Sequence, residues 1–292
     1  MPTFDTPGPI LVTLEIGVGD VRIAASERHD TNVVVRPSNP ARKSDLEAAE
    51  QTRVEFSEGR LLIKAPKGWR HFTPRGGGES VDVQIDLPAG SGLRGEAGVA
   101  ALHCAGPLGE CRYTTGVGDI QIDYAGPVHL TTGVGDVQVN RVSGDAQITT
   151  GSGAVRVGSV AGSAVIKGAN GDTSIGDVSR DVRVIAANGS IAVDRSHATV
   201  VAKTANGDVR LREVGGGTVV AQTALGKVDV GIRAGVAAWL DLDTHFGKVH
   251  NELDAADRPQ PGAETVEVRA RSSFGDITIR RSVERRTAAG VV

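Results

Sequence analysis

The chain has 292 residues and a formal net charge of −3, so it lacks the strongly basic composition that is typical of nucleic-acid-binding proteins. Aromatic residues make up only 3% of it, which argues against a sugar-binding surface built on aromatic stacking. Two cysteines, Cys104 and Cys111, are too few for a disulfide framework. We expect both to be buried free thiols, with a bridge between them as the alternative.

Residues 1–92 form the first predicted region, an irregular β cap. The start of the chain shows neither a signal peptide nor a run long enough to span a membrane, so we expect a cytoplasmic protein without membrane insertion. A short helix is expected at Ser44–Thr52, with Ser44 as its N-cap. Alternating apolar residues predict strands at Ile10–Ile16, Val21–Ala24, Asn32–Arg36, Arg53–Phe56, Arg60–Lys64 and Val81–Leu87.

The stretch Lys64–Glu79, KAPKGWRHFTPRGGGE, breaks this alternation. It mixes aromatic with basic residues and ends in three glycines before a glutamate. One interpretation is a partner-binding or anion-binding loop, because interfaces favour Trp and Arg. The simpler one is a hairpin connection whose aromatic side chains fold back on the cap. The candidate partner-binding residues are Lys67, Trp69, Arg70, His71, Phe72 and Arg75.

A six-residue motif, TTGVGD, occurs at Thr114–Asp119 and again at Thr131–Asp136. Related copies follow at steps of 17 to 21 residues, with one final step of 28. The motif glycines are Gly118, Gly135, Gly153, Gly171, Gly189, Gly207, Gly226, Gly247 and Gly275. With a weaker copy before the first, residues 93–281 comprise about ten tandem repeats, and residues 282–292 are expected to form a flexible tail.

Each repeat contains two short runs in which apolar and polar residues alternate, the pattern of a half-buried strand. Two strands in about 18 residues cannot enclose a core alone, but stacked copies can. The sequence therefore predicts an all-β fold, a parallel β-solenoid of about ten coils with two main strands per coil. The motif glycines should lie at the corners. One sheet should place Ile122, Val139 and Val157 inside and Gln121, Gln138 and Arg156 outside, while His129 and Gln147 face out from the other.

The glycine motif is not a nucleotide-binding loop, because no copy has the Lys-Ser/Thr pair that a phosphate loop requires. Calcium is also disfavoured, since the aspartate position is occupied elsewhere by Ala154, Ser190, Lys227 and Lys248, and calcium requires oxygen ligands. The substitutions would instead interrupt a self-repelling aspartate column. The histidines share no metal-binding spacing. We expect no cofactor, no metal and no catalytic residue.

The repeats become longer towards the C-terminus. Trp239 and Phe246 lie in one of these longer copies, and we expect them to cap the core. The polar stretch Asn251–Glu264 that follows is expected to be a surface loop.

Three features together resemble the bacterial putative-adhesin domain family, a β-strand-repeat family of unknown function. They are LEIGVGDVRIAA (Leu14–Ala25), VDVQIDLPAGSGLRGEAG (Val81–Gly98) and the repeated T-x-x-G-D-[VI]-x-[VI], which ends in SSFGDITIR (Ser272–Arg280). The resemblance covers nearly the whole chain and implies the same strand-repeat fold. It supplies no catalytic residues. The family's label implies attachment at the cell surface.

The pattern favours a non-catalytic solenoid scaffold that binds an unidentified protein partner through its polar outer faces or its caps, with homo-oligomers as a further option. One alternative is a self-assembling, cytoskeleton-like solenoid, although a filament-forming protein leaves its ends free and this chain devotes about ninety residues to one end. Another alternative is a β-helix protein that binds or cleaves carbohydrates. Such a site needs paired carboxylates, and the outward positions show no such cluster.

Overall fold

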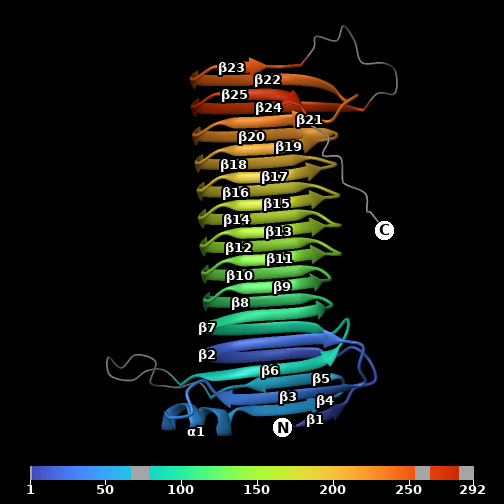
Figure 1. The fold of residues 1–292 in the computed structure, drawn as a ribbon, viewed down its shortest axis with the longest axis vertical. Coiled ribbons are helices and arrows are strands. Elements are labelled where there is room, and N and C mark those ends of the chain that lie inside the picture. The colour runs from blue at the N-terminus through green and yellow to red at the C-terminus, as the bar shows by residue number, and fades with distance from the viewer. Residues whose placement is uncertain (1, 67–78, 254–263, 283–292) are drawn as a thin grey trace, which may run out of the picture. The chain divides into compact units, whose positions relative to one another are not determined.

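The computed structural model describes residues 2–66, 79–253 and 264–282, and it divides into unit 1 (residues 1–171) and unit 2 (residues 172–292). Within each unit, strands from successive repeats stack in parallel register, which confirms the predicted all-β solenoid with its irregular N-terminal β region (Figure 1). The described residues contain one helix, α1 (Lys43–Gln51), which is too short and too polar to span a membrane.

The first strand of the solenoid in unit 1 is β2. In the sequence it comes before most of the residues of the predicted cap, residues 1–92. β2 (Leu11–Ser26) pairs in parallel with β7 (Gly92–Pro107) along almost its whole length. The two strands expected at Ile10–Ile16 and Val21–Ala24 are therefore one continuous strand, and the intervening Gly-Val-Gly-Asp is its corner. On its other side, β2 pairs in parallel with β5 (Arg60–Lys64) and β6 (Val81–Pro88).

The cap also contains strands that run antiparallel to their neighbours. The remaining cap strands are β1 (Thr3–Asp5), β3 (Asp30–Pro37) and β4 (Arg53–Ser57). β3 runs antiparallel to both β1 and β6, and β4 runs antiparallel to β5. Because antiparallel strands cannot continue the solenoid register, the stack of parallel coils ends here.

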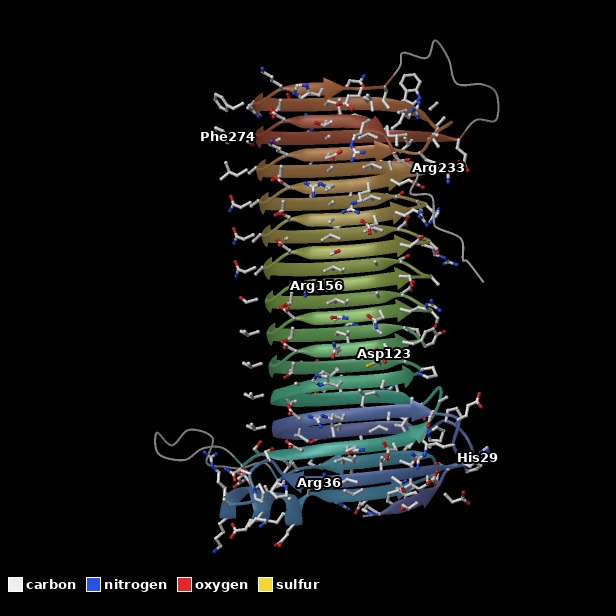
Figure 2. The ribbon with its side chains drawn as sticks, viewed as in Figure 1. His29, Arg36, Asp123, Arg156, Arg233 and Phe274 are labelled. Atoms are coloured by element: carbon white, nitrogen blue, oxygen red, sulfur yellow. The ribbon has the colours of Figure 1, made fainter. Side chains whose placement is uncertain are left out.

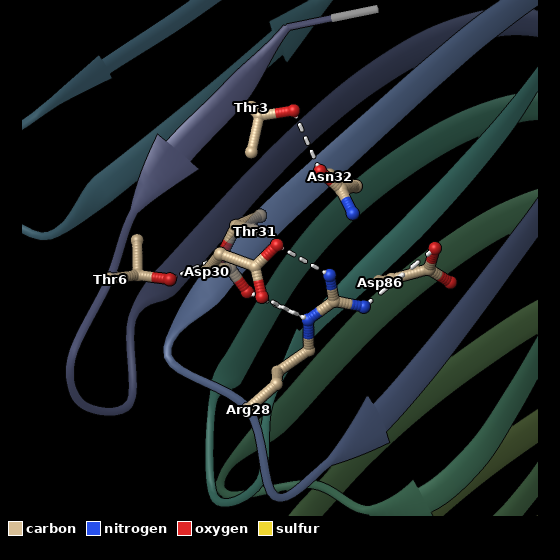
Figure 3. Close-up of polar contacts among 7 residues, drawn as sticks. All are labelled: Thr3, Thr6, Arg28, Asp30, Thr31, Asn32 and Asp86. Carbon is tan, nitrogen blue, oxygen red and sulfur yellow. Dashed lines mark hydrogen bonds and ion pairs between the residues drawn. The ribbon is translucent and has the colours of Figure 1, made fainter.

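A polar cluster fixes the turn between β2 and β3 (Figure 3). Arg28 donates from Nε and Nη2 to the two carboxylate oxygens of Asp30, at 3.0 and 2.8 Å, and its Nη1 lies 3.8 Å from Asp86. The hydrogen bond from Arg28 lowers the pKa of Asp30. Next to it, the buried hydroxyls of Thr6 and Thr31 are hydrogen-bonded at 2.9 Å. These contacts tie β1 and β6 to the same turn.

The predicted helix is confirmed, but its predicted N-cap is wrong. Arg42 occupies the cap position and makes no capping bond through its side chain, while the Ser44 hydroxyl donates to Asp45. Asp45 is buried and accepts the backbone N–H groups of Asn39 and Ser80 at 3.2 and 3.3 Å. The acidic residue of the first turn thus serves the loops around the helix, a tertiary role that local sequence does not reveal.

The regular coils of unit 1 form two parallel sheets. One contains β8 (Cys111–Val117), β10 (Val128–Val134), β12 (Ala146–Ser152) and β14 (Ala164–Asn170). The other contains β9 (Ile120–Ala125), β11 (Val137–Val142) and β13 (Val155–Val160). Ile122, Val139 and Val157 are register neighbours and are at most 3% exposed, which confirms the predicted core column.

The Gly-Asp pair of the motif joins neighbouring coils where the aspartate is present. Gly135 has φ of 147°, and a Cβ there would lie 2.2 Å from the carbonyl oxygen of Gly118, so only glycine permits this approach. The carboxylate of Asp119 accepts the backbone N–H of Asp136 at 2.8 Å, and Asp136 accepts that of Ala154 at the same distance. Asp at this position is therefore an acceptor for the next coil. Ala at the receiving position still supplies the N–H, which explains why the column tolerates interruption.

The core of unit 1 also holds both cysteines. Cys104 and Cys111 are buried and not bridged, as expected. Burial raises the pKa of Cys111 to about 12 and that of Cys104 well above its usual value. The ring of Tyr113 is buried near them, and its position requires glycine at residue 95, where a Cβ would lie 2.6 Å from the ring.

Unit 2 repeats the two-sheet arrangement. One sheet contains β16 (Val182–Asn188), β18 (Val200–Asn206), β20 (Gly217–Leu225), β22 (Ala237–Phe246) and β24 (Thr265–Phe274). The other contains β15 (Thr173–Val178), β17 (Ile191–Ser196), β19 (Val209–Val214), β21 (Val228–Ile232), β23 (Val249–Asn251) and β25 (Ile277–Arg281). All pairings described within the unit are parallel.

The last two coils exchange their order. β24 pairs with β20 on one side and with β22 on the other, and β25 likewise lies between β21 and β23. The coil made of β22 and β23 is thus outermost in unit 2, although it comes earlier in the sequence (Figure 1). This corrects the expectation that Trp239 and Phe246 cap the core. Each is 68% exposed, and Phe246 stacks on Phe274 with ring centroids 4.8 Å apart.

Candidate interaction surface

The loop residues that the sequence marks as candidates, Lys67, Trp69, Arg70, His71, Phe72 and Arg75, lie outside the described residues. The other predicted surfaces, the polar outer faces of the two sheets, are described in unit 1.

On the first face, a row of basic and polar side chains crosses four neighbouring strands. Arg94 of β7, Arg112 of β8, His129 of β10 and Gln147 of β12 are successive register partners, and all four are exposed. They face outward because residues on either side of them, such as Leu93, alternate into the core. Since neighbouring strands lie about 4.8 Å apart, the two arginines and the histidine form a row about 10 Å long.

Two shallow cavities of about 300 and 350 Å³ adjoin along this row, and both are lined by Arg112 and His129. Arg94 lines one of them, and Glu110 and Gln147 line the other. The surface is therefore a shallow groove that runs across the strands. We call the four side chains Arg94, Arg112, His129 and Gln147 the cross-strand row.

Two of the four carboxylates that line these cavities, Glu15 and Glu110, are paired with cations. The Nε of Arg112 donates to Glu110 at 2.6 Å, and this hydrogen bond, with the charge of Arg94, lowers the pKa of Glu110. Glu15 forms an ion pair with Lys64 at 2.7 Å. Within the described residues, Arg94 has no ion-pair partner and no three His, Cys, Asp or Glu side chains are grouped as a metal site would need. The row thus offers cationic donors to an approaching ligand.

The opposite face is also polar, but many of its side chains form hydrogen bonds with one another. Gln121, Gln138 and Arg156 are register neighbours that face solvent, as predicted. Asn140 donates to Asp123 at 3.2 Å, Gln138 donates to Asn140 at 3.3 Å, and Arg156 donates to Asp136 at 3.3 Å. Figure 2 labels Asp123 and Arg156 on this face. Its donors and acceptors are largely paired with one another, which leaves less for a partner.

Sequence reasoning identified His129 and Gln147 but did not identify Arg94 and Arg112. The signal was present, because aligning each repeat with the preceding one places Arg112 beside His129 and Arg94 beside Arg112. What was missing was the register of the irregular first coils, where the motif is weakest.

A family model described as Toastrack DUF4097 matches residues 12–289. Among solved structures, similar chains include a putative adhesin from Bacteroides fragilis, with a TM-score of 0.41, 12% identity and coverage of 95% of this chain and 96% of that one. A putative adhesin from Parabacteroides merdae has a TM-score of 0.35, 12% identity and coverage of 97% and 95%. A putative lipid binding protein from Parabacteroides distasonis has a TM-score of 0.31, 13% identity and coverage of 97% and 96%. No curated protein matches.

Proposed function

The chain belongs to the Toastrack DUF4097 family, and we propose that it acts as a non-catalytic scaffold that binds a protein partner. The cross-strand row of unit 1 is the surface proposed for this contact. A cytoplasmic location and the absence of turnover belong to the same proposal.

The observation that carries the proposal is the exposed cross-strand row, with its two arginines, on a rigid support. Arg94, Arg112 and His129 stand on consecutive strands whose inward neighbours are fully packed, so their backbone positions are fixed before a ligand arrives. A preorganised surface loses little conformational entropy on binding. Guanidinium groups bind carboxylates through paired hydrogen bonds, so the partner is expected to present acidic side chains.

The test uses two matched triple variants of the full chain. One replaces Arg94, Arg112 and His129 by serine, and the other replaces Gln121, Gln138 and Arg156 by serine on the opposite face. Each variant serves as bait in a cross-linking pull-down from cells of the source organism, after its melting temperature has been compared with that of the parent. Proteins captured by the parent and by the second variant, but lost with the first, are the expected result. Equal capture by both variants would reject the cross-strand row as the contact surface.

A further inference from the structure

Strand β22 in unit 2 is paired along one edge only. It follows β24 in register from Ala237 to Phe246, and the described residues place no strand on its other side. In the same column of the sheet, the N–H of Val182 donates to the next coil at 2.8 Å. Leu240 is the equivalent of Val182 in the outermost strand. The successive register partners between the two are Val200, Val219 and Val268. The N–H and C=O groups of Leu240, and by alternation those of Leu242, therefore point away from β24.

Apart from two aspartates, this edge lacks the features by which proteins usually protect an exposed strand. β22 has ten residues, contains no proline, lysine or arginine, and pairs with β24 through Thr244 without a bulge. Its inward side chains Leu240 and Leu242 are only half-buried, whereas their register partners Val268 and Ala270 are fully buried. An added strand would cover apolar surface as well as satisfy backbone groups.

The outward side chains of β22 give the edge a charge. Asp241 and Asp243 both contact the same guanidinium, that of Arg271 on β24, at 2.9 and 3.3 Å. The neighbouring Arg269 is already paired with Glu267 at 2.7 Å. The outward side chains of β22 are thus acidic at Asp241 and Asp243. The cation that contacts both, Arg271, lies on the neighbouring strand β24 and not on the edge strand itself. A strand added outside β22 would meet the two carboxylates first.

We propose that the free edge of β22 is a β-augmentation site for an extended peptide segment that carries Lys or Arg at alternate positions. Backbone hydrogen bonds to Leu240 and Leu242 would hold the segment, as in other strand-addition complexes. Basic side chains two residues apart would match the spacing of Asp241 and Asp243. A second copy of the chain fits less well. Antiparallel pairing of β22 with itself about Leu242 would set Asp241 opposite Asp243, and like charges directly opposite destabilise a strand pair.

The probe is a labelled peptide, acetyl-TKVKVKT-amide, titrated against the full chain by fluorescence anisotropy. Two matched peptides serve as controls, the acidic analogue acetyl-TEVEVET-amide and a basic version N-methylated at alternate residues, which cannot donate to the edge. We expect the basic peptide to bind about tenfold more tightly than the acidic one, as for two exposed ion pairs. The N-methylated peptide should lose the binding, because its strand pairing is blocked.

Two variants locate the binding on β22. Asp241→Lys combined with Asp243→Lys should reverse the preference between the basic and the acidic peptide. Leu242→Pro removes one outward N–H and should weaken the basic peptide by about tenfold, while the melting temperature changes little. Three outcomes would overturn the proposal: no binding of the basic peptide at about 1 mM, equal binding of the N-methylated peptide, or an unchanged preference in the double lysine variant. A dimer seen by light scattering and dissolved by Leu242→Pro would assign the edge to a second copy instead.

Discussion

The N-terminal cap of unit 1 and the last coil of unit 2 both terminate parallel sheets, but they do so by opposite means. In the cap, β3 and β4 run antiparallel to their neighbours, and the edge strands are short and charged: β1 has three residues, and β4 has five with Arg53 paired to Glu55. In the last coil, β22 is as regular as the strands before it and simply has no outer neighbour among the described residues. A parallel coil does not end itself. In the cap a change of strand direction ends the stack, whereas in the last coil that change is absent and the outer edge of β22 is unpaired within the described residues.

Substitutions in the regular coils, which lie between other coils, should change the free energy of unfolding most. Val139→Asp would place a carboxylate in a column that is fully buried, and we expect a loss of about 4 kcal/mol or more in the free energy of unfolding. Gln138→Asp, one residue away on the outer face, should cost about 0.5 kcal/mol or less. Denaturant unfolding of both variants measures the difference. Similar losses would show that the strand register is wrong.

The two terminating regions should then respond unequally to the loss of an apolar side chain. Ile85 of β6 is fully buried between β2 and β3, so Ile85→Ala should cost about 2–5 kcal/mol. Leu240 of β22 is half-buried, and Leu240→Ala should cost about 1 kcal/mol. Equal costs, measured by the same denaturant unfolding, would mean that the last coil is covered as well as the cap.

Hydrogen exchange measures the same difference in pairing without a mutation. The backbone amide of Ile85 lies in a strand that is paired on both sides and should exchange only through large-scale opening. The amides of Leu240 and Leu242 point to the free edge of β22 and should exchange orders of magnitude faster. Mass spectrometry of exchanged fragments can resolve the two regions. Strong protection at Leu242 in the isolated protein would contradict the free edge.

A smaller effect concerns the pH dependence of the cap. Because Arg28 lowers the pKa of Asp30, the folded pKa lies below the unfolded value, and the ionised carboxylate stabilises the folded state above that unfolded value, near 4. This contribution is lost as the pH falls through the folded pKa. Asp30→Asn should lower the melting temperature at pH 7, and the difference from the parent should disappear at acidic pH. If the parent and Asp30→Asn still differed in melting temperature by the same amount at pH 3, the ionised Asp30 carboxylate would not be the cause.

The smallest expected signal comes from the cysteines. Burial raises the pKa of both thiols, so Cys104 and Cys111 should not react with a thiol reagent at pH 8 until the protein unfolds. The sign of the pH effect is opposite to that of Asp30. Stability is present below the unfolded thiol pKa near 8.5 and declines as the pH rises above it. Fast labelling of the folded protein would show that the cores of the first coils open readily.

Much of the fold was predictable because the repeat determines the register. Once Ile122, Val139 and Val157 occupy equivalent positions, stacking follows from the need to bury them. The function of the Gly-Asp pair was not predictable, because the aspartate of one repeat bonds the backbone of the next, and such a contact is visible only after the coils are stacked. The sequence pattern suggested charge interruption, whereas hydrogen bonding explains the position directly.

The exchange of the last coils was also beyond prediction from periodicity. The alternation of β22 and β24 is similar, with Leu240 and Leu242 in one strand where Val268 and Ala270 stand in the other, so either could pack against β20. Of the candidate surface, the outward direction of His129 and Gln147 followed from alternation alone. The arginines that complete the cross-strand row required the register of the irregular first coils.

The exchanged coils have a consequence for how the protein is made. During synthesis, a solenoid can extend from its N-terminus one coil at a time, but here the segment that forms β22 leaves the ribosome before β24, the strand on which it finally lies. Until β24 has emerged, the strand edge of this sheet that is open to β22 is that of β20, the place that β24 will occupy. We therefore expect a nascent chain that stops near residue 253 to adopt a different, sequential arrangement of its last coil, which the complete chain must undo or avoid.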